Sequence, residues 1–155
     1  MPNRFMSRAI ELSLRNVRSG KGGPFAAVIV KKGRIIAEGA NRVTSINDPT
    51  AHAEIVAIRK ACKALKRFQL DGCEIYTTCE PCPMCLGAIY WARPAKVYFG
   101  SLQKDAAQVG FDDSFIFHEL KLPISRRRIQ MIPLMRKEAL EAFRAWEQKP
   151  DKIEY

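Results

Sequence analysis

The sequence predicts an α/β fold in which helices pack against a mixed β-sheet. Stretches with strand character alternate with stretches of helical periodicity, and the order strand, helix, strand, helix, strand favours parallel neighbouring strands. A chain of 155 residues with 47% hydrophobic residues is long enough to bury a core. The sequence shows no linker, internal repeat or low-complexity segment, so we expect a single domain over residues 1–155.

The first part of the chain predicts a covering helix and a β-hairpin. Apolar residues at near-helical spacing over residues 3–18 indicate an amphipathic helix that ends at Ser19-Gly20. The continuous apolar run Phe25–Val30 is typical of a central strand. A turn at Lys31-Lys32-Gly33 then leads into a second strand over residues 34–39, paired with the first as a hairpin.

The later elements follow a loop over residues 40–49. A helix that starts near His52 is apolar over much of its surface, which predicts that it is buried. The remaining expected elements are strands at 73–78, 96–100 and 128–132, helices at 82–91 and 135–146, a short helix after 111–117, and a tail at 149–155.

Two short motifs contain the residue types of a catalytic zinc site. They are His52-Ala53-Glu54 and Pro81-Cys82-Pro83-Met84-Cys85. One imidazole (His52) and two thiolates (Cys82, Cys85) can hold one Zn²⁺ ion per chain and leave the fourth tetrahedral position for water. Glu54 is a carboxylate outside this ligand set, which suits it to move a proton between that water and a substrate.

The spacing of both motifs requires helix starts. Residues two apart on a helix point about 200° away from each other, so His52 and Glu54 can face one site only at a helix end. Pro81 and Pro83 suit the first turn of a helix, where Cys82 and Cys85 lie side by side. We therefore expect two helix N-termini to point at one ion and to lower the pKa of the cysteine thiols.

These motifs resemble the H-x-E and P-C-x-x-C signature of the zinc-dependent nucleobase deaminases. The order of elements is similar to the cytidine deaminase fold, which implies three α/β/α layers around a central five-stranded sheet. Further stretches resemble the small bacterial guanine deaminases within that superfamily: Gly22–Phe25, Asn47–Glu54, Cys85–Pro94 and Gly110–Phe115.

The resemblance implies hydrolytic deamination of guanine at C2, which gives xanthine and ammonia. Zinc-bound hydroxide would attack C2, while Glu54 would carry the proton. Guanine presents two donors on one edge, so a carboxylate suits it; the resemblance points to Asp113, although spacing alone would allow Asp112 nearly as well. Asn41 offers a donor and an acceptor to a heterocycle, or is a turn asparagine.

Other implied contacts to the base are less specific. Phe25 and Trp91 can stack on a flat ring, but aromatic residues near a core also serve packing. The resemblance further implies a homodimer, in which a C-terminal segment from about residue 133 is exchanged and Tyr155 closes the neighbour's site. A frayed tail is the simpler interpretation of Tyr155 from the sequence alone.

Several other functions compete with this interpretation. Cys79 extends the motif to C-x-x-C-x-x-C, which could form a structural Cys3His zinc site in an interaction module, or part of an iron–sulfur cluster. The zinc motifs are also shared with cytosine deaminases and with transfer-RNA-editing adenosine deaminases. His118, the other histidine, has no comparable neighbours and is expected on the surface or in packing.

Net charge and cysteine content limit which partners and which cellular compartment we expect. The net charge of +10 invites a nucleic-acid partner, but the stretch Lys104–Glu119 carries one base against four acids, which argues against one. Five cysteines, an odd number, suit a reducing compartment. No apolar run is long enough to span a bilayer and no signal-peptide region is present, so we expect a cytoplasmic protein without a membrane partner.

Overall fold

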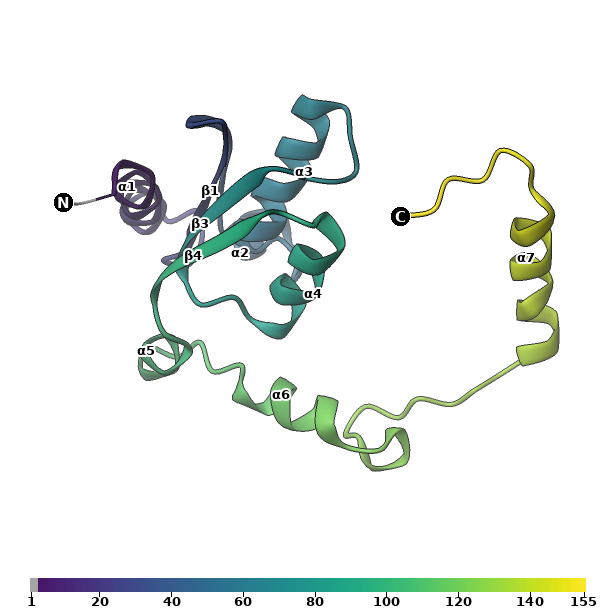
Figure 1. Ribbon diagram of the computed structural model, residues 1–155. Helices are drawn as coiled ribbons and strands as arrows, with labels where there is room; N and C mark the ends of the chain where they lie inside the picture. The colour runs from purple at the N-terminus through teal and green to yellow at the C-terminus, as the bar shows by residue number, and fades with distance from the viewer. Residues whose placement is uncertain (1–2) are drawn as a thin grey trace. The chain divides into compact units, whose positions relative to one another are not determined.

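The computed structural model describes residues 3–155, which divide into two compact units. Unit 1 is Met1–Asp113 and unit 2 is Ser114–Tyr155. The sheet belongs to unit 1, whereas unit 2 is built from helices and irregular segments (Figure 1). Whether residues 1–155 behave as one domain stays a prediction.

Unit 1 contains a mixed four-stranded sheet with the order β2-β1-β3-β4. Its strands are β1 (Ala26–Lys31), β2 (Arg34–Ala40), β3 (Cys73–Cys79) and β4 (Lys96–Ser101). Strand β1 is antiparallel to both β2 and β3, while β3 and β4 are parallel. The predicted hairpin and the parallel pair of the later strands are therefore confirmed, but β1 lies between β2 and β3.

The helices of unit 1 include three that were predicted and two that were not. They are α1 (Arg4–Arg18), α2 (Val43–Ile46), α3 (Ala53–Leu65), α4 (Pro83–Ala92) and α5 (Gln103–Gln108). The short helices α2 and α5 have no buried residues, so the sequence carries no apolar stripe that would have revealed them.

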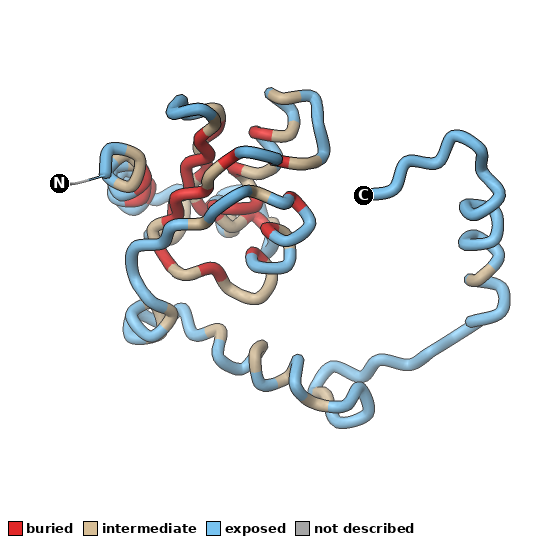
Figure 2. Tube along the Cα trace, in the orientation of Figure 1, coloured by how far each residue is buried: buried red, intermediate tan, exposed pale blue. Residues whose placement is uncertain are grey.

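The alternation of side chains along β1 and β3 makes three layers. Val28, Val30 and Tyr76 pack against α1 on one face of the sheet. Ile29 and Ile75 point to the other face, where they pack with residues of α3 and α4. Figure 2 shows the buried segments concentrated in these strands and in the helices of unit 1. The α/β/α arrangement confirms the predicted fold class. It also explains the continuous apolar run in β1, since a strand covered on both faces is apolar on both sides.

The approach of α3 to the sheet depends on Gly39 in β2. A Cβ atom at this position would lie 2.6 Å from the backbone nitrogen of Ala57 in α3 and would collide with its helix. Ala57 is itself fully buried. Because Gly39 has no side chain and that of Ala57 is small, α3 packs closely on β2. This close packing fixes where the N-terminus of α3 points.

Helix α1 is capped by Asn3, whose side-chain oxygen accepts hydrogen bonds from the backbone N–H groups of Phe5 and Met6. Its buried residues are Ala9, Ser13 and Asn16, whereas the apolar Val17 is 51% exposed. The buried side of α1 is therefore partly polar.

Unit 2 consists of α6 (Ser114–Lys121), the short 3₁₀ helix η1 (Ile124–Arg126) and α7 (Arg136–Gln148), none of which contains a buried residue. The expected fifth strand is not confirmed, because residues 128–132 form no strand in the described chain. Ile129 and Ile132 in this segment are 78% and 79% exposed. Within residues 3–155, none of the helices has both the length and the apolar character needed to cross a membrane.

Candidate metal and catalytic site

The imidazole of His52 lies at the start of α3. His52 is the N-cap residue, with an extended backbone (φ −67°, ψ 158°), and the helix begins at the next residue. Its side chain makes no capping hydrogen bond, so it is available to a ligand beyond the helix end. Glu54 occupies the first turn of the same helix. The helix start thus explains how residues two apart serve one site.

The two cysteines lie at the start of α4 in a closely similar arrangement. Cys82 is the N-cap residue with an extended backbone (φ −66°, ψ 167°), and Pro83 is the first helical residue, where no N–H is needed. The backbone N–H of Cys85 donates to Sγ of Cys82 at 3.5 Å. Both sulfur atoms are therefore at the positive end of the helix dipole.

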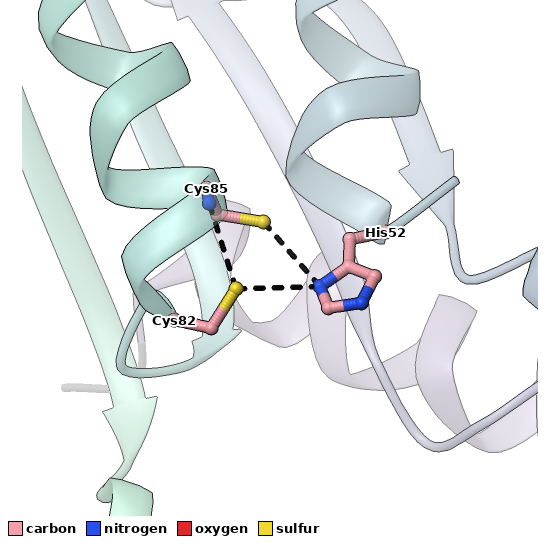
Figure 3. A group of neighbouring side chains, drawn as sticks. All are labelled: His52, Cys82 and Cys85. Carbon is pink, nitrogen blue, oxygen red and sulfur yellow. Dashed lines mark hydrogen bonds between the residues drawn. The ribbon is translucent and has the colours of Figure 1, made fainter. Parts of the chain in front are cut away.

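The three side chains converge on one point (Figure 3). Nδ1 of His52 lies 3.5 Å from Sγ of Cys82 and 3.5 Å from Sγ of Cys85. A tetrahedral zinc ion, with bonds of about 2.0 Å to nitrogen and 2.3 Å to sulfur, separates such ligands by about 3.6 Å. His52, Cys82 and Cys85 are thus positioned to bind zinc, and their donor atoms all lie within 4.8 Å of one another.

The two thiols at the site differ in acidity. The pKa of Cys82 is lowered to about 4, first because the Cys85 thiol donates a hydrogen bond to it. The pKa of Cys85 is raised by the same bond and by burial, so the predicted lowering holds for Cys82 alone. The pKa of His52 is raised, first by its hydrogen bond with Cys82. Two adjacent thiolates need a positive charge between them, which a divalent ion supplies.

Glu54 lies beside the sulfur atoms without joining the ligand set. Its Oε2 is 3.4 Å from Sγ of Cys85, and its Oε1 accepts a hydrogen bond from Oγ1 of Thr77 at 2.9 Å. The side chain is 6% exposed, and burial raises the pKa of this carboxyl. A carboxyl that can hold a proton next to the metal ligands fits a general acid and base.

Thr77 is a site residue that the sequence interpretation missed. It lies in β3 and is 1% exposed. Its neighbour Tyr76 faces α1, so the two-residue period of a strand turns Thr77 toward α3. The available signal was a hydroxyl at an inward position of an otherwise apolar strand, which requires a buried partner.

Cys79 does not complete a Cys3His site. Its Sγ lies 3.7 Å from the backbone oxygen of Leu102, which accepts its hydrogen bond. Within the described residues, the metal-binding group contains His52, Cys82 and Cys85 and does not include this third cysteine. The geometry therefore favours a site with three protein ligands over a closed structural site.

Asn41 directly follows β2 and is 6% exposed. Its side-chain oxygen accepts hydrogen bonds from the backbone N–H groups of Gly23, at 3.3 Å, and Val43, at 3.2 Å. The expectation that Asn41 offers a donor and an acceptor together is therefore wrong for the acceptor, which the protein uses itself. The amide NH2 is the group that remains for a ligand.

Asp113 lies within electrostatic range of the metal ligands. Its negative charge contributes to the raised pKa of His52. Its own pKa is raised, first by burial and then by the charge of Cys82. Phe25 packs edge to face with Phe111, with ring centroids 4.9 Å apart. The stacking role of Phe25, and the choice of Asp113 over Asp112, stay predictions.

The other two predicted contacts are exposed side chains. Trp91 lies near the C-terminal end of α4, away from Cys82 at its start, and is 62% exposed. Tyr155 belongs to unit 2 and is 69% exposed. Their proposed roles at the site stay predictions.

Comparison with known proteins identifies the family. The profile of the cytidine and deoxycytidylate deaminase zinc-binding region matches residues 1–101. The chain belongs to this deaminase family. It is 56% identical to the guanine deaminase of Bacillus subtilis over 151 residues, which is 97% of each chain. The crystal structure of guanine deaminase from B. subtilis superposes with a TM-score of 0.96 at 55% identity, covering 99% of both chains.

Deaminases that act on transfer RNA share a smaller part of the chain. The transfer-RNA-specific adenosine deaminase of Aquifex aeolicus is 44% identical over 100 residues, which is 64% of this chain and 66% of that protein. Membership of the family accounts for the zinc ligands of this chain. It does not by itself distinguish guanine from transfer RNA as the substrate.

Proposed function

We propose that this protein is a zinc-dependent guanine deaminase, which hydrolyses guanine at C2 to xanthine and ammonia. The observation that carries the proposal is the similarity to B. subtilis guanine deaminase along 97% of the chain, against 64% for the A. aeolicus transfer-RNA deaminase. The chain's own site supports it, because the metal ligands and Glu54 come together at the starts of α3 and α4, and Asp113 lies within electrostatic range of Cys82.

The residues divide the reaction between them. His52, Cys82 and Cys85 would hold the zinc, which would supply an activated water as the nucleophile. Glu54 takes one proton from this water and delivers it to ring nitrogen N3, which makes C2 electrophilic. After the hydroxyl has added to C2, Glu54 takes the hydroxyl proton and passes it to the amine; the C–N bond breaks, C2 becomes a carbonyl, and one water has entered for one ammonia that leaves. Burial raises the pKa of this carboxyl, which suits a group that must accept and hold a proton during the reaction.

The base is held by hydrogen bonds of opposite polarity. Asp113 accepts from N1–H of guanine, a donor that adenine and cytosine do not present at the corresponding position. Asn41 donates its amide NH2 to an acceptor on the ring, because its oxygen is already bonded to Gly23 and Val43. A buried group that needs a particular partner discriminates strongly against a base that lacks it.

The test is a substrate panel with the zinc-loaded protein. Guanine, adenine, cytosine and a transfer-RNA anticodon stem-loop are each incubated with it, and ammonia release and the purine product are measured. We expect turnover of guanine to xanthine at a rate far above the others. Turnover of the stem-loop instead would establish the editing function that the net charge of +10 favours. Zinc binding without any ammonia release would indicate a non-catalytic module.

We also propose a homodimer that exchanges the segment from about residue 133. The supporting observation is that unit 2 has no buried residue, while its apolar residues Leu134 and Phe143 are 82% and 71% exposed. A surface of this kind suits an interface between copies. Sedimentation equilibrium should give a dimer that Phe143→Asp weakens and Arg144→Asp, its neighbouring control, does not. A monomeric wild type would contradict the proposal.

The proposed location is the cytoplasm. All five cysteines of the chain are free thiols in the structure, which suits a reducing compartment.

A further inference from the structure

Asn16 is a buried polar residue on α1 that neither the metal site nor the helix itself requires. Its side chain is 7% exposed. The amide nitrogen donates hydrogen bonds to two backbone oxygens, those of Gly23 and Asn41, both at 2.9 Å. The two acceptors lie 7 and 25 residues farther along the chain, so this amide joins three segments: α1, the loop before β1 and the end of β2.

The hydrogen bonds of Asn41 leave one of its groups available. Its backbone N–H donates to the oxygen of Phe25 at 3.0 Å, and its backbone oxygen accepts from Asn16. Its side-chain oxygen accepts from Gly23 and Val43. Since the structure has no buried side-chain nitrogen or oxygen without a partner among residues 3–155, the amide NH2 of Asn41 must be accessible. The backbone and the side-chain oxygen of Asn41 are thus held by hydrogen bonds, which leaves the NH2 donor for a ligand.

The loop before β1 is built to stay in contact with Asn41. A Cβ atom on Gly22 would lie 2.8 Å from the carbonyl carbon and 2.9 Å from Oδ1 of Asn41, and still closer to its carbonyl oxygen. A side chain at this position would therefore push Asn41 away from the loop. Asn16 and Gly22 both maintain the contact between the loop before β1 and Asn41. Asn16 does so by hydrogen bonds, and Gly22 by having no side chain.

We propose that Asn16 is a positioning residue for recognition of the purine base, acting through Asn41. By holding Gly23 and the backbone of Asn41 together, it keeps the Oδ1 of Asn41 on its two N–H donors and its NH2 directed at an acceptor of the base. The inference rests on the proposed guanine deaminase function. It adds a residue of α1, remote in sequence from both zinc motifs, to the determinants of substrate binding.

The expected signature is a change in binding with little change in turnover. In Asn16→Ala the two backbone oxygens lose their donor, the Asn41 amide is no longer held, and one hydrogen bond to the base weakens. We expect KM for guanine to rise about fivefold to thirtyfold, with kcat within about twofold of wild type. Zinc content should stay at one per chain, because none of the metal ligands contacts Asn16.

Ser13→Ala is the matched control. Ser13 lies one turn before Asn16 on α1, is 8% exposed, and its hydroxyl donates within the helix to the oxygen of Ile10. The Ser13→Ala substitution removes a buried polar group from the same face of α1 and leaves the hydrogen bonds of Asn41 intact. We expect KM to be unchanged in this variant, whereas a rise equal to that of Asn16→Ala would mean that α1 acts only through general stability.

A double-mutant cycle decides whether Asn16 acts through Asn41. In the Asn41→Ala background, Asn16→Ala should raise KM no further, while additive effects would overturn the proposal. The dissociation constant of guanine, measured by equilibrium dialysis in the inactive Glu54→Gln background, should rise by the same factor as KM.

A second variant keeps the test decisive if Asn16→Ala does not fold. Gly22→Ala should raise KM in the same way, whereas Gly87→Ala in α4, where a Cβ atom meets nothing within 4 Å, should not. An unchanged KM in both Asn16→Ala and Gly22→Ala would overturn the inference. A wild type that does not deaminate guanine would instead overturn the proposed function, so the two failures are distinguishable.

Discussion

Units 1 and 2 differ most in where they place their apolar side chains. In the described part of the chain, all buried residues lie in unit 1, between Ala9 and Ala92. Unit 2 leaves its apolar residues on the surface, with Leu134, Ile132 and Ile129 at 82%, 79% and 78% exposure (Figure 2). Unit 1 has a core of its own, whereas unit 2 exposes its apolar residues, which is the pattern from which the exchanged segment was proposed.

This difference explains why the metal ligands and the proton carrier lie in unit 1, where packing fixes their positions. Metal ligands and a proton carrier must keep their geometry to fractions of an ångström, which requires elements locked by packing. Both site helices start at the edge of the buried sheet, and Glu54 is anchored on β3 through Thr77. The helices of unit 2 contain no buried residue, so unit 2 offers no comparably packed frame for a metal site.

The sharpest test of this division removes one metal ligand. Cys82→Ala should lose nearly all bound zinc and all measurable turnover, because two remaining ligands cannot hold the ion in a tetrahedral site. Cys79→Ala is the matched control, since its thiol bonds to Leu102 and stands outside the group. Zinc is measured by atomic absorption. A zinc-free Cys79→Ala variant would revive the Cys3His interpretation.

The next largest effect separates metal binding from catalysis within unit 1. Glu54→Gln keeps the shape of the side chain but cannot carry the proton, so we expect zinc to be retained and kcat to fall about 10²–10⁴-fold. Steady-state kinetics with guanine and a zinc assay on the same sample check both statements. Near-normal turnover would remove Glu54 from the mechanism.

A deletion tests what unit 2 adds. If the tail closes a site, a chain that ends at Pro150 should fold and bind zinc but lose activity by about 10²-fold, because a base that is not enclosed is poorly oriented. Tyr155→Ala should reproduce most of this loss, with Glu154→Ala as its neighbouring control. Full activity in the truncated chain would mean that unit 1 suffices and that Tyr155 belongs to a frayed end.

The sequence predicted the parts of the molecule that depend on local spacing. The zinc ligands could be found because each motif sits at a helix start, so that a few adjacent residues set its geometry. The central strand followed from the apolar run Phe25–Val30, which is typical of a strand covered on both faces, whereas the three layers were implied by the resemblance to the cytidine deaminase fold. These features need no knowledge of which distant segments meet.

Contacts between distant segments could not be predicted. Thr77 reaches Glu54 across 23 positions of the sequence, and Asn16 reaches Asn41 across 25. A threonine in a strand and an asparagine in a helix have many ordinary explanations, and only the packed fold shows their partners. The fifth strand failed for a related reason, since residues 128–132 have an apolar pattern but no neighbouring strand in the described chain.

A smaller effect tests whether β3 positions the proton carrier. Thr77→Val removes the hydroxyl that donates to Oε1 of Glu54 while preserving most of the buried shape. We expect kcat to fall about tenfold, the loss of roughly one hydrogen bond to a charged group, with KM and zinc content unchanged. Thr78→Val is the control, since its hydroxyl accepts from the backbone of Ala26. Equal losses in both would indicate a general disturbance of β3.

The smallest effect concerns how α1 is fastened to the sheet of unit 1. Arg8 donates two hydrogen bonds to Glu38 of β2, at 2.7 and 3.0 Å, and the first cause of the lowered pKa of Glu38 is this contact. Because the folded state binds this proton more weakly than the unfolded state, the pair stabilises the fold above the ordinary carboxyl pKa of about 4.3. The contribution disappears as the pH falls through the lowered value.

Glu38→Gln should therefore reduce the free energy of unfolding by about 1 kcal/mol or less at pH 7, and this reduction should shrink as the pH falls below the ordinary carboxyl pKa. Thermal unfolding over a pH series measures the difference, and Glu11→Gln, which removes an exposed partner of Arg8, should have little effect at any pH. A loss that stays undiminished at low pH would mean that the carboxylate charge is irrelevant and that Glu38 acts through packing. In that case α1, and the Asn16 contact that it carries, would be held to the sheet by the apolar residues around Ala9 alone.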